Sequence, residues 1–317
     1  MASKDMGYAA RDPPIIVCIM HRERTWVILL TGGGADPHDS KNERVNNASG
    51  EFSPSPERRS LFEMTLSRAR SIVPREQIAV VIDGAQKPYW GESLAMIPAA
   101  NIIARPRHRG SATEVLLAIL TILERDPLAR IIAMPSHHYV SNESALADSL
   151  LDAATPTAQT RNNLALIGIK PEVADTQSDY IVPGRWFEDG TRSLLRIVKP
   201  SGKILARDLV ARGALWDSSI VAARALVLVG ILRMCVPDLV DQMETALTQG
   251  LDVRQRALTQ LYARLPPVDL SHVLAQGAEA KCRVITSRSC GWSNLASPQR
   301  TMNAAQPSIR RRATATV

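Results

Sequence analysis

The stretch Trp26–Gly34 constrains the fold more than any other part of the chain, because an apolar run ends there at three consecutive glycines. A run such as Trp26–Leu30 bounded by a glycine turn is typical of a strand buried on both faces, at the centre of a parallel α/β sheet. Gly32, Gly33 and Gly34 have no side chains, so their backbone N–H groups can approach an anion closely. A glycine turn after a strand is also often only a turn.

Strands and helices are predicted to alternate after this stretch. Ser55 and Pro56 are typical of a helix start. Ser111 and Glu114 have the spacing of a capping box, before an apolar helix that runs to about Leu123. The apolar runs predicted as strands are Ile78–Ile82, Asn101–Ala104 and Arg130–Met134.

This order predicts an α/β fold with a mostly parallel central sheet and helices on both faces. Such sheets bind ligands beyond the carboxyl ends of their strands. The loops expected to converge at that edge are 32–34, 105–110 and 135–138.

The C-terminal part of the chain is predicted to be mainly helical. Apolar residues recur at three- and four-residue spacing in Ala223–Met234, Pro237–Leu247 and Asp252–Leu265, which indicates a helical insert packed on the sheet. Cys282–Thr286 then returns as a strand. We expect three regions along the chain, namely a flexible leader (1–23), one domain (24–302) and a disordered basic tail (303–317).

Composition excludes several classes of function. The formal net charge is +7, part of it from the tail arginines, and no basic face studded with aromatic residues accompanies it, so we expect no nucleic acid partner. The 4 cysteines match no common zinc spacing, which favours reduced thiols and a cytoplasmic location. No apolar run has the length of a membrane span, and Met1–Asp12 lacks a signal-peptide core.

Several short motifs carry a resemblance to a known family. In order, they are Trp26–Gly33, Arg105-Pro106-Arg107-His108-Arg109-Gly110-Ser111-Ala112, Pro135-Ser136-His137-His138-Tyr139-Val140, Lys199-Pro200, Gly213-Ala214-Leu215-Trp216-Asp217-Ser218 and Gly291-Trp292-Ser293-Asn294-Leu295. Their order and approximate spacing resemble those of bacterial mannose-1-phosphate guanylyltransferases, which are sugar nucleotidyltransferases. The resemblance spans roughly residues 24–305 and implies a Rossmann-like nucleotidyltransferase fold.

The resemblance implies a reaction and a set of ligands. Enzymes of this family join GTP to mannose 1-phosphate and release pyrophosphate, with a bound Mg²⁺. Lys199 is implied as a catalytic and sugar-phosphate-binding residue, and Asp217 as a second sugar-phosphate-binding residue. The implied nucleotide-binding residues are Gly32, Gly33, Gly34, Arg109, Gly110 and Ser136.

Much of the family's apparatus for phosphate and metal is replaced in this chain. The position of the phosphate-binding arginine falls on Pro37, and that of a phosphate-binding lysine falls on Asn46. The two metal-binding aspartates fall on His137 and Asn294. Mg²⁺ prefers hard anionic oxygen, so the resemblance implies a cofactor whose protein ligands are absent.

The sugar side also departs from the family pattern. Asp179 stands where the family has a glycine, and the added anion should repel a sugar phosphate. Val198 replaces the glutamate before Lys199, and Asp217 replaces an asparagine.

Two hypotheses follow from these replacements. The chain is either an enzyme of the guanylyltransferase type with impaired catalysis, or an inactive paralogue that binds a nucleotide, a sugar nucleotide or a protein partner. In either case the chain could form a homodimer.

Single residues also have alternative interpretations. His137 and His138 could be a metal pair of another kind or hydrogen-bonded histidines. Arg105, Arg107 and Arg109 could form an anion site or plain surface charge.

Overall fold

The computed structural model describes residues 24–32, 60–84, 92–154 and 163–294. The predicted leader and tail, Gly33, Gly34 and the predicted helix start at Ser55 lie outside these residues. The apolar run forms strand β1 (Thr25–Leu30), and all its residues are buried. It lies between β2 (Ile78–Asp83) and β4 (Arg130–Pro135) and is parallel to both. The prediction of a buried central strand is therefore confirmed.

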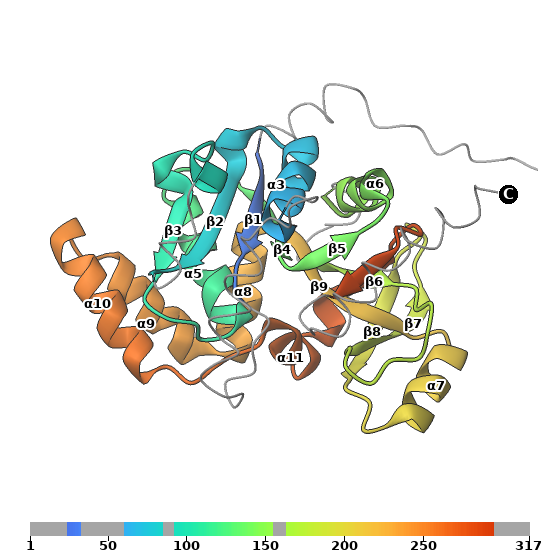
Figure 1. Cartoon of the computed structure of the whole chain (residues 1–317). Helices are drawn as coiled ribbons and strands as arrows, with labels where there is room; N and C mark the ends of the chain where they lie inside the picture. The colour runs from blue at the N-terminus through green and yellow to red at the C-terminus, as the bar shows by residue number, and fades with distance from the viewer. Residues whose placement is uncertain (1–23, 33–59, 85–91, 155–162, 295–317) are drawn as a thin grey trace, which may run out of the picture.

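One large sheet organises the molecule (Figure 1). Its strand order is β3-β2-β1-β4-β9-β6-β10-β8-β7, and the first four strands are mutually parallel. The strands not yet given bounds are β3 (Ile102–Arg105), β6 (Leu164–Ile169), β7 (Tyr180–Trp186), β8 (Arg192–Val198), β9 (Leu215–Arg224) and β10 (Cys282–Thr286).

The second half of the sheet corrects the prediction of a mostly parallel sheet. β9 is antiparallel to both its neighbours β4 and β6, and β8 is antiparallel to β10 and β7. β7 and β8 are joined by a short turn, and two strands joined in this way must run in opposite directions. The sheet is therefore mixed. Buried strands of this kind carry apolar residues whatever their direction, so the sequence pattern did not distinguish the two cases.

Helices cover both faces of the sheet, as predicted. Residues of α3 (Leu61–Ile72), α6 (Glu143–Ala154) and α7 (Lys203–Ala211) pack in one hydrophobic cluster, and residues of α5 (Ser111–Leu123) pack in the other. The predicted C-terminal helical insert is present and packs beside α5 (Figure 1). Its helices are α8 (Ala225–Cys235), α9 (Pro237–Leu247), α10 (Leu251–Arg264) and α11 (Leu270–Ala275).

A small second sheet joins two distant parts of the chain. β5 (His138–Val140) pairs with β11 (Trp292–Asn294) in antiparallel register, with Asn294 opposite His138. Short 3₁₀ turns complete the structure at Arg75–Gln77, Glu92–Leu94, Ala99–Asn101 and Glu279–Lys281.

The capping box does not lie where the sequence predicted it. The capping box lies at Ser60 and Glu63, at the start of α3. The capping box predicted at Ser111 and Glu114 is absent, because Gly110 is the N-cap of α5 and the Glu114 carboxylate points into an ion-pair network. A buried charge partner competes for the glutamate, and local spacing cannot reveal this.

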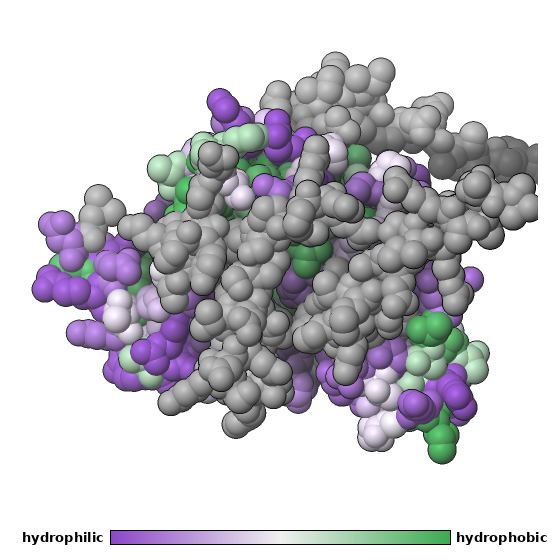
Figure 2. All heavy atoms as spheres, viewed as in Figure 1, coloured by the Kyte–Doolittle hydropathy of each residue, from purple (hydrophilic) through white to green (hydrophobic). Residues whose placement is uncertain are grey.

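The surface exposes some apolar side chains, and the described cysteines are free thiols. Apolar side chains reach the surface around α7, at the lower right of Figure 2, where Ile204 and Leu205 are exposed while Ala206 and Leu209 are buried. Cys235, Cys282 and Cys290 form no disulfide. Within the part of the chain that the structure describes, no helix combines the length and apolarity that a membrane crossing requires.

Candidate functional site

The first part of the candidate site lies where β1 and β4 end. Gly32 follows β1 with a positive φ of 71°, a conformation that favours glycine. Ser136 follows β4, and its hydroxyl donates a hydrogen bond of 2.8 Å to the carbonyl oxygen of Leu30. The backbone N–H of Ser136 donates to the same oxygen at 3.0 Å. The structure thus brings two predicted nucleotide-binding residues together, and Ser136 also joins the ends of the two strands.

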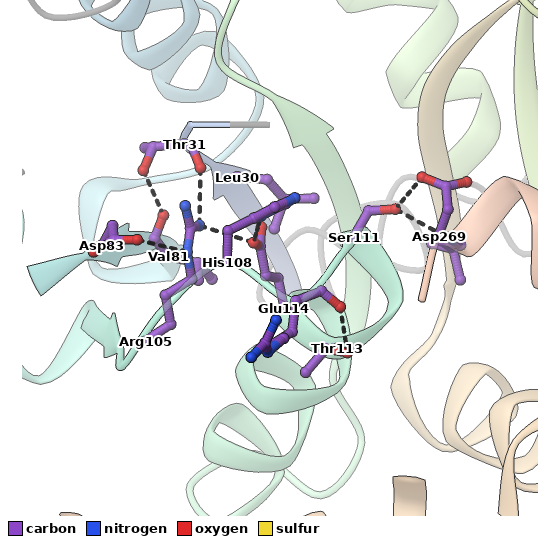
Figure 3. A network of polar contacts seen from close by, with 12 residues as sticks. Leu30, Thr31, Val81, Asp83, Arg105, His108, Ser111, Thr113, Glu114 and Asp269 are labelled. Atoms are coloured by element: carbon purple, nitrogen blue, oxygen red, sulfur yellow. Dashed lines mark hydrogen bonds and ion pairs between the residues drawn. The ribbon is translucent and has the colours of Figure 1, made fainter. Parts of the chain in front are cut away.

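A buried network lies beside this edge (Figure 3). Arg105 is 2% exposed, and its guanidinium donates to the Thr31 carbonyl oxygen at 2.8 Å and pairs with Glu114 at 3.0 Å. Asp83 lies 3.9 Å from its Nε, and Nδ1 of His108 lies 2.5 Å from Glu114. The alternative of plain surface charge is wrong for Arg105, because its guanidinium is buried. Its charge is balanced inside the protein, and it fixes the residue that precedes Gly32.

The loop before α5 is held by the C-terminal part of the chain. Nε of Arg109 donates to the Tyr262 carbonyl oxygen at 2.7 Å. Val268 makes two backbone hydrogen bonds of 3.0 Å, donating to Arg109 and accepting from Ala112. Gly110 has a φ of 84°, and a Cβ atom there would overlap the Val268 backbone. Both predicted nucleotide-binding residues in this loop, Arg109 and Gly110, therefore have contacts that fix the fold.

The sugar side of the candidate site lies in the other half of the sheet. Pairing of β7 with β9 puts Asp179 next to Asp217, and the Asp217 N–H donates to the Asp179 carbonyl oxygen at 2.8 Å. The Lys199 ammonium lies 3.7 Å from the Asp179 carboxylate and donates to the Gln177 carbonyl oxygen at 3.1 Å. The structure thus groups Lys199 and Asp217, both predicted, with Asp179.

Asp217 is a buried carboxyl group. It accepts a hydrogen bond of 2.8 Å from the Ser219 N–H. Burial raises the pKa of Asp217 to about 6, and the nearby charges of Asp179 and Asp269 act in the same direction. Sequence reasoning missed Asp269, which lies far along the chain and is brought near by α11. It also accepts a hydrogen bond of 2.9 Å from the Ser111 hydroxyl.

The two positions at which the resemblance implies metal carboxylates meet at the small sheet. His137 directly precedes β5, and Asn294 lies across from His138 in β11. Burial lowers the pKa of His137 to about 4 and that of His138 well below its ordinary value, so both imidazoles are neutral at pH 7. The Nδ1 atoms of both histidines are buried and have no hydrogen-bond partner among the described residues.

Aromatic packing surrounds these histidines. The rings of His138 and Trp292 meet edge to face at 5.0 Å, and Trp216 lies 6.0 Å from Trp292. Both tryptophans are buried, which agrees with a role in the core.

The residues at this position do not fit Mg²⁺. Neutral imidazole and amide groups stand where hard anionic oxygen is required. Across the described ranges, no group of three or more His, Cys, Asp or Glu side chains is placed to hold a metal ion.

The fold is similar to that of several proteins of known structure. The chain superposes on them with a nucleotidyltransferase-like α/β fold. The structure of a Thermus thermophilus protein described as mannose-1-phosphate geranyltransferase matches with a TM-score of 0.75 and 20% identity, over 89% of this chain and 79% of that one. A UDP-glucose pyrophosphorylase in complex with UDP-glucose matches with a TM-score of 0.54 and 11% identity, over 90% and 99%.

Comparison of sequences gives more specific matches than comparison of folds. A Vibrio cholerae protein named "Putative mannose-1-phosphate guanylyltransferase" is 26% identical over 202 residues, which is 62% of this chain and 42% of that protein. Xanthan biosynthesis protein XanB of Xanthomonas campestris is 27% identical over 214 residues, 65% and 43% of the two chains. The chain thus resembles a protein named as a mannose-1-phosphate guanylyltransferase, as the motifs indicated, and its match spans less than half the length of these relatives. No family model matches.

Proposed function

We propose that the chain is a protein of the mannose-1-phosphate guanylyltransferase type that binds a guanine nucleotide and whose catalysis is impaired. One observation carries the proposal. The resemblance implies metal carboxylates at His137 and Asn294. The β5–β11 pairing puts Asn294 across from His138, the residue after His137, and neither position is a carboxylate.

The electrostatics support impaired catalysis. Transfer of a nucleotidyl group from a triphosphate depends on positioning and on stabilisation of the charge that develops on the phosphates. Removal of one such stabilising group typically lowers the rate by about a hundredfold or more. Neutral His137 and Asn294 supply no negative charge to hold a cation, and the positions of the phosphate-binding arginine and lysine fall on Pro37 and Asn46.

The retained framework supports nucleotide binding. Gly32 keeps the positive φ of a tight turn, and Thr31 and Ser136 are fixed by hydrogen bonds to neighbouring strands. Residues that are already fixed lose less conformational entropy when a ligand binds. Backbone N–H groups at Gly32 and the two following glycines are the proposed contacts to phosphate, with Arg109 and Gly110 at the next loop.

Two assays on the same mixtures test the proposal. Purified protein receives GTP, mannose 1-phosphate and Mg²⁺, and pyrophosphate release and thermal unfolding are both measured, with an active bacterial guanylyltransferase as the control. We expect a rise in melting temperature with GTP or GDP-mannose and turnover far below that of the control. Turnover equal to the control would contradict impaired catalysis. No thermal response to any nucleotide would contradict nucleotide binding and leave a protein partner as the leading role.

A further inference from the structure

The ion pair between Asp179 and Lys199 carries an inference about ligand choice. We infer that Asp179 is a specificity-determining residue, which occupies Lys199 as a tethered anion and so excludes phosphate monoesters from it. The inference rests on the proposed function only in placing a sugar phosphate at Lys199.

Strand register builds this pair into the fold. Tyr180 lies opposite Val198 in the antiparallel β7–β8 ladder, so Asp179 and Lys199, one residue beyond, face each other at the end of the ladder. Tyr180 also lies opposite Trp216 in β9. Opposite charges on directly paired strands attract each other. The backbone register therefore places the two residues side by side, and the side chains of Lys199 and Asp179, 65% and 42% exposed, approach to 3.7 Å.

The Lys199 ammonium has two polar contacts among the described residues. It donates to the Gln177 carbonyl oxygen at 3.1 Å and lies 3.7 Å from the Asp179 carboxylate. A lysine presents a compact point charge, and a phosphate oxygen would have to replace the carboxylate to pair with it. A partner in the same chain competes at an effective concentration on the order of millimolar, so a weakly binding monoester is displaced.

The surrounding charges add to this exclusion. Asp217 is buried beside Asp179, and Asp269 is near enough to act on the pKa of both carboxyl groups. Lys199 and His272 are the basic groups that act on Asp179. A phosphate dianion at Lys199 would therefore lie beside the Asp179 carboxylate, with the charges of Asp217 and Asp269 near Asp179, and like charges repel each other. A neutral hydroxyl-bearing group avoids this repulsion.

The test compares Asp179→Asn with the wild-type chain. The asparagine keeps the shape of the side chain and the backbone hydrogen bond to Asp217, and it removes only the charge. Affinity for mannose 1-phosphate and for inorganic phosphate is measured by isothermal titration calorimetry. We expect binding about two- to fivefold tighter in D179N than in wild type. We expect most of this gain to be lost when D179N/K199A is compared with K199A, because the released lysine is its main cause.

Controls separate charge from other effects. Asp208→Asn removes an exposed carboxylate that pairs with Arg212 on α7, away from Lys199, and should leave phosphate affinity unchanged. Asp179→Gly is the second variant should the asparagine disturb folding. Equal affinity in D179N and wild type, or a gain that is undiminished when K199A is the background, would overturn the inference. GTP binding is titrated separately, so a failure of the proposed nucleotide site is seen independently.

Discussion

Arg105 carries a permanent positive charge in a place almost without solvent, and Glu114 balances it. The two side chains are 1% and 2% exposed, and their atoms approach to 3.0 Å. Removing one partner of a buried pair leaves the other charge desolvated and unpaired, which costs far more than the net worth of the pair. The same arginine donates a hydrogen bond to the Thr31 carbonyl oxygen, so its removal should also destabilise the turn at Gly32.

We therefore expect Arg105→Ala to lower the free energy of unfolding by about 3 to 5 kcal/mol. Urea unfolding followed by circular dichroism measures this. Arg212→Ala is the matched control, because Arg212 forms an exposed pair with Asp208 and should change stability by less than about 1 kcal/mol. Similar effects of the two substitutions would show that the Arg105 network does not support the fold.

Asp217 makes stability depend on pH. Its pKa of about 6 in the folded protein lies above the ordinary value of 3.8, so folding favours the protonated form. The stability that comes from this preference is present in full below about pH 4 and is lost as the pH rises through about 6. At neutral pH the chain folds with a buried charge that opposes folding.

Asp217→Asn should consequently stabilise the protein at pH 7 but not at pH 4. The difference in free energy of unfolding between variant and wild type should grow to on the order of 2 to 3 kcal/mol across this window. Denaturation of both proteins at several pH values measures it. His137 and His138 titrate alike in both proteins and cancel in the difference. A difference that does not vary with pH would mean that the Asp217 pKa is not raised.

At the scale of elements, α5 begins against the segment between α10 and α11. Gly110 is the point of closest approach, since its φ of 84° and the Val268 backbone leave no room for a side chain. Gly190 has a similar φ of 77°, but a Cβ atom there would meet no other atom of the described residues within 4 Å. The Gly190→Ala substitution therefore measures the free-energy cost of the positive φ alone.

Gly110→Ala should therefore cost more than Gly190→Ala. We expect about 1 kcal/mol for Gly190→Ala from the positive φ alone. We expect about 2 to 4 kcal/mol for Gly110→Ala, because overlap with Val268 adds to the same conformational cost. Thermal and urea unfolding of both variants supply the comparison. Equal losses would indicate that α5 and the Val268 segment can separate without penalty.

The small β5–β11 sheet permits a test of the lost metal site. β11 places Asn294 opposite His138, the residue after His137, so His137→Asp combined with Asn294→Asp would create two carboxylates at this small sheet. We expect the double variant to gain a rise in melting temperature with millimolar Mg²⁺ that the wild type and the single variants lack, because Mg²⁺ prefers carboxylate oxygen. No response in the double variant would show that the loss extends beyond these two residues.

At the scale of the whole molecule, the sequence was most informative where local pattern decides structure. The buried strand β1, the helices on both faces and α9 followed from periodicity, and the resemblance followed from motifs that stay in order. Strand direction in the second half of the sheet did not follow, because buried strands look alike in either direction. The Arg105–Glu114 pair did not follow either, because it joins a strand end to a helix that only tertiary packing brings together.

The sequence predicts several residues of the candidate site, but it does not predict the contacts that these residues make. Lys199 and Asp217 do lie in one region, but Asp269 reaches it from more than fifty residues further along the chain, where no local signal marks it. Arg109 and Gly110 are predicted to bind a nucleotide, but in the structure they contact Tyr262 and Val268. Long-range contacts of this kind require the fold to be known first.

The hydrogen bonds of Val268 to the loop before α5 also set an order of events during synthesis. The ribosome makes residues 105–112 long before it makes Val268, and β5 long before its partner β11. Until that later part of the chain emerges, neither the loop nor β5 has these backbone partners. A nascent chain that ends before Val268 therefore carries this half of the candidate site unfinished, exposed to proteases and chaperones.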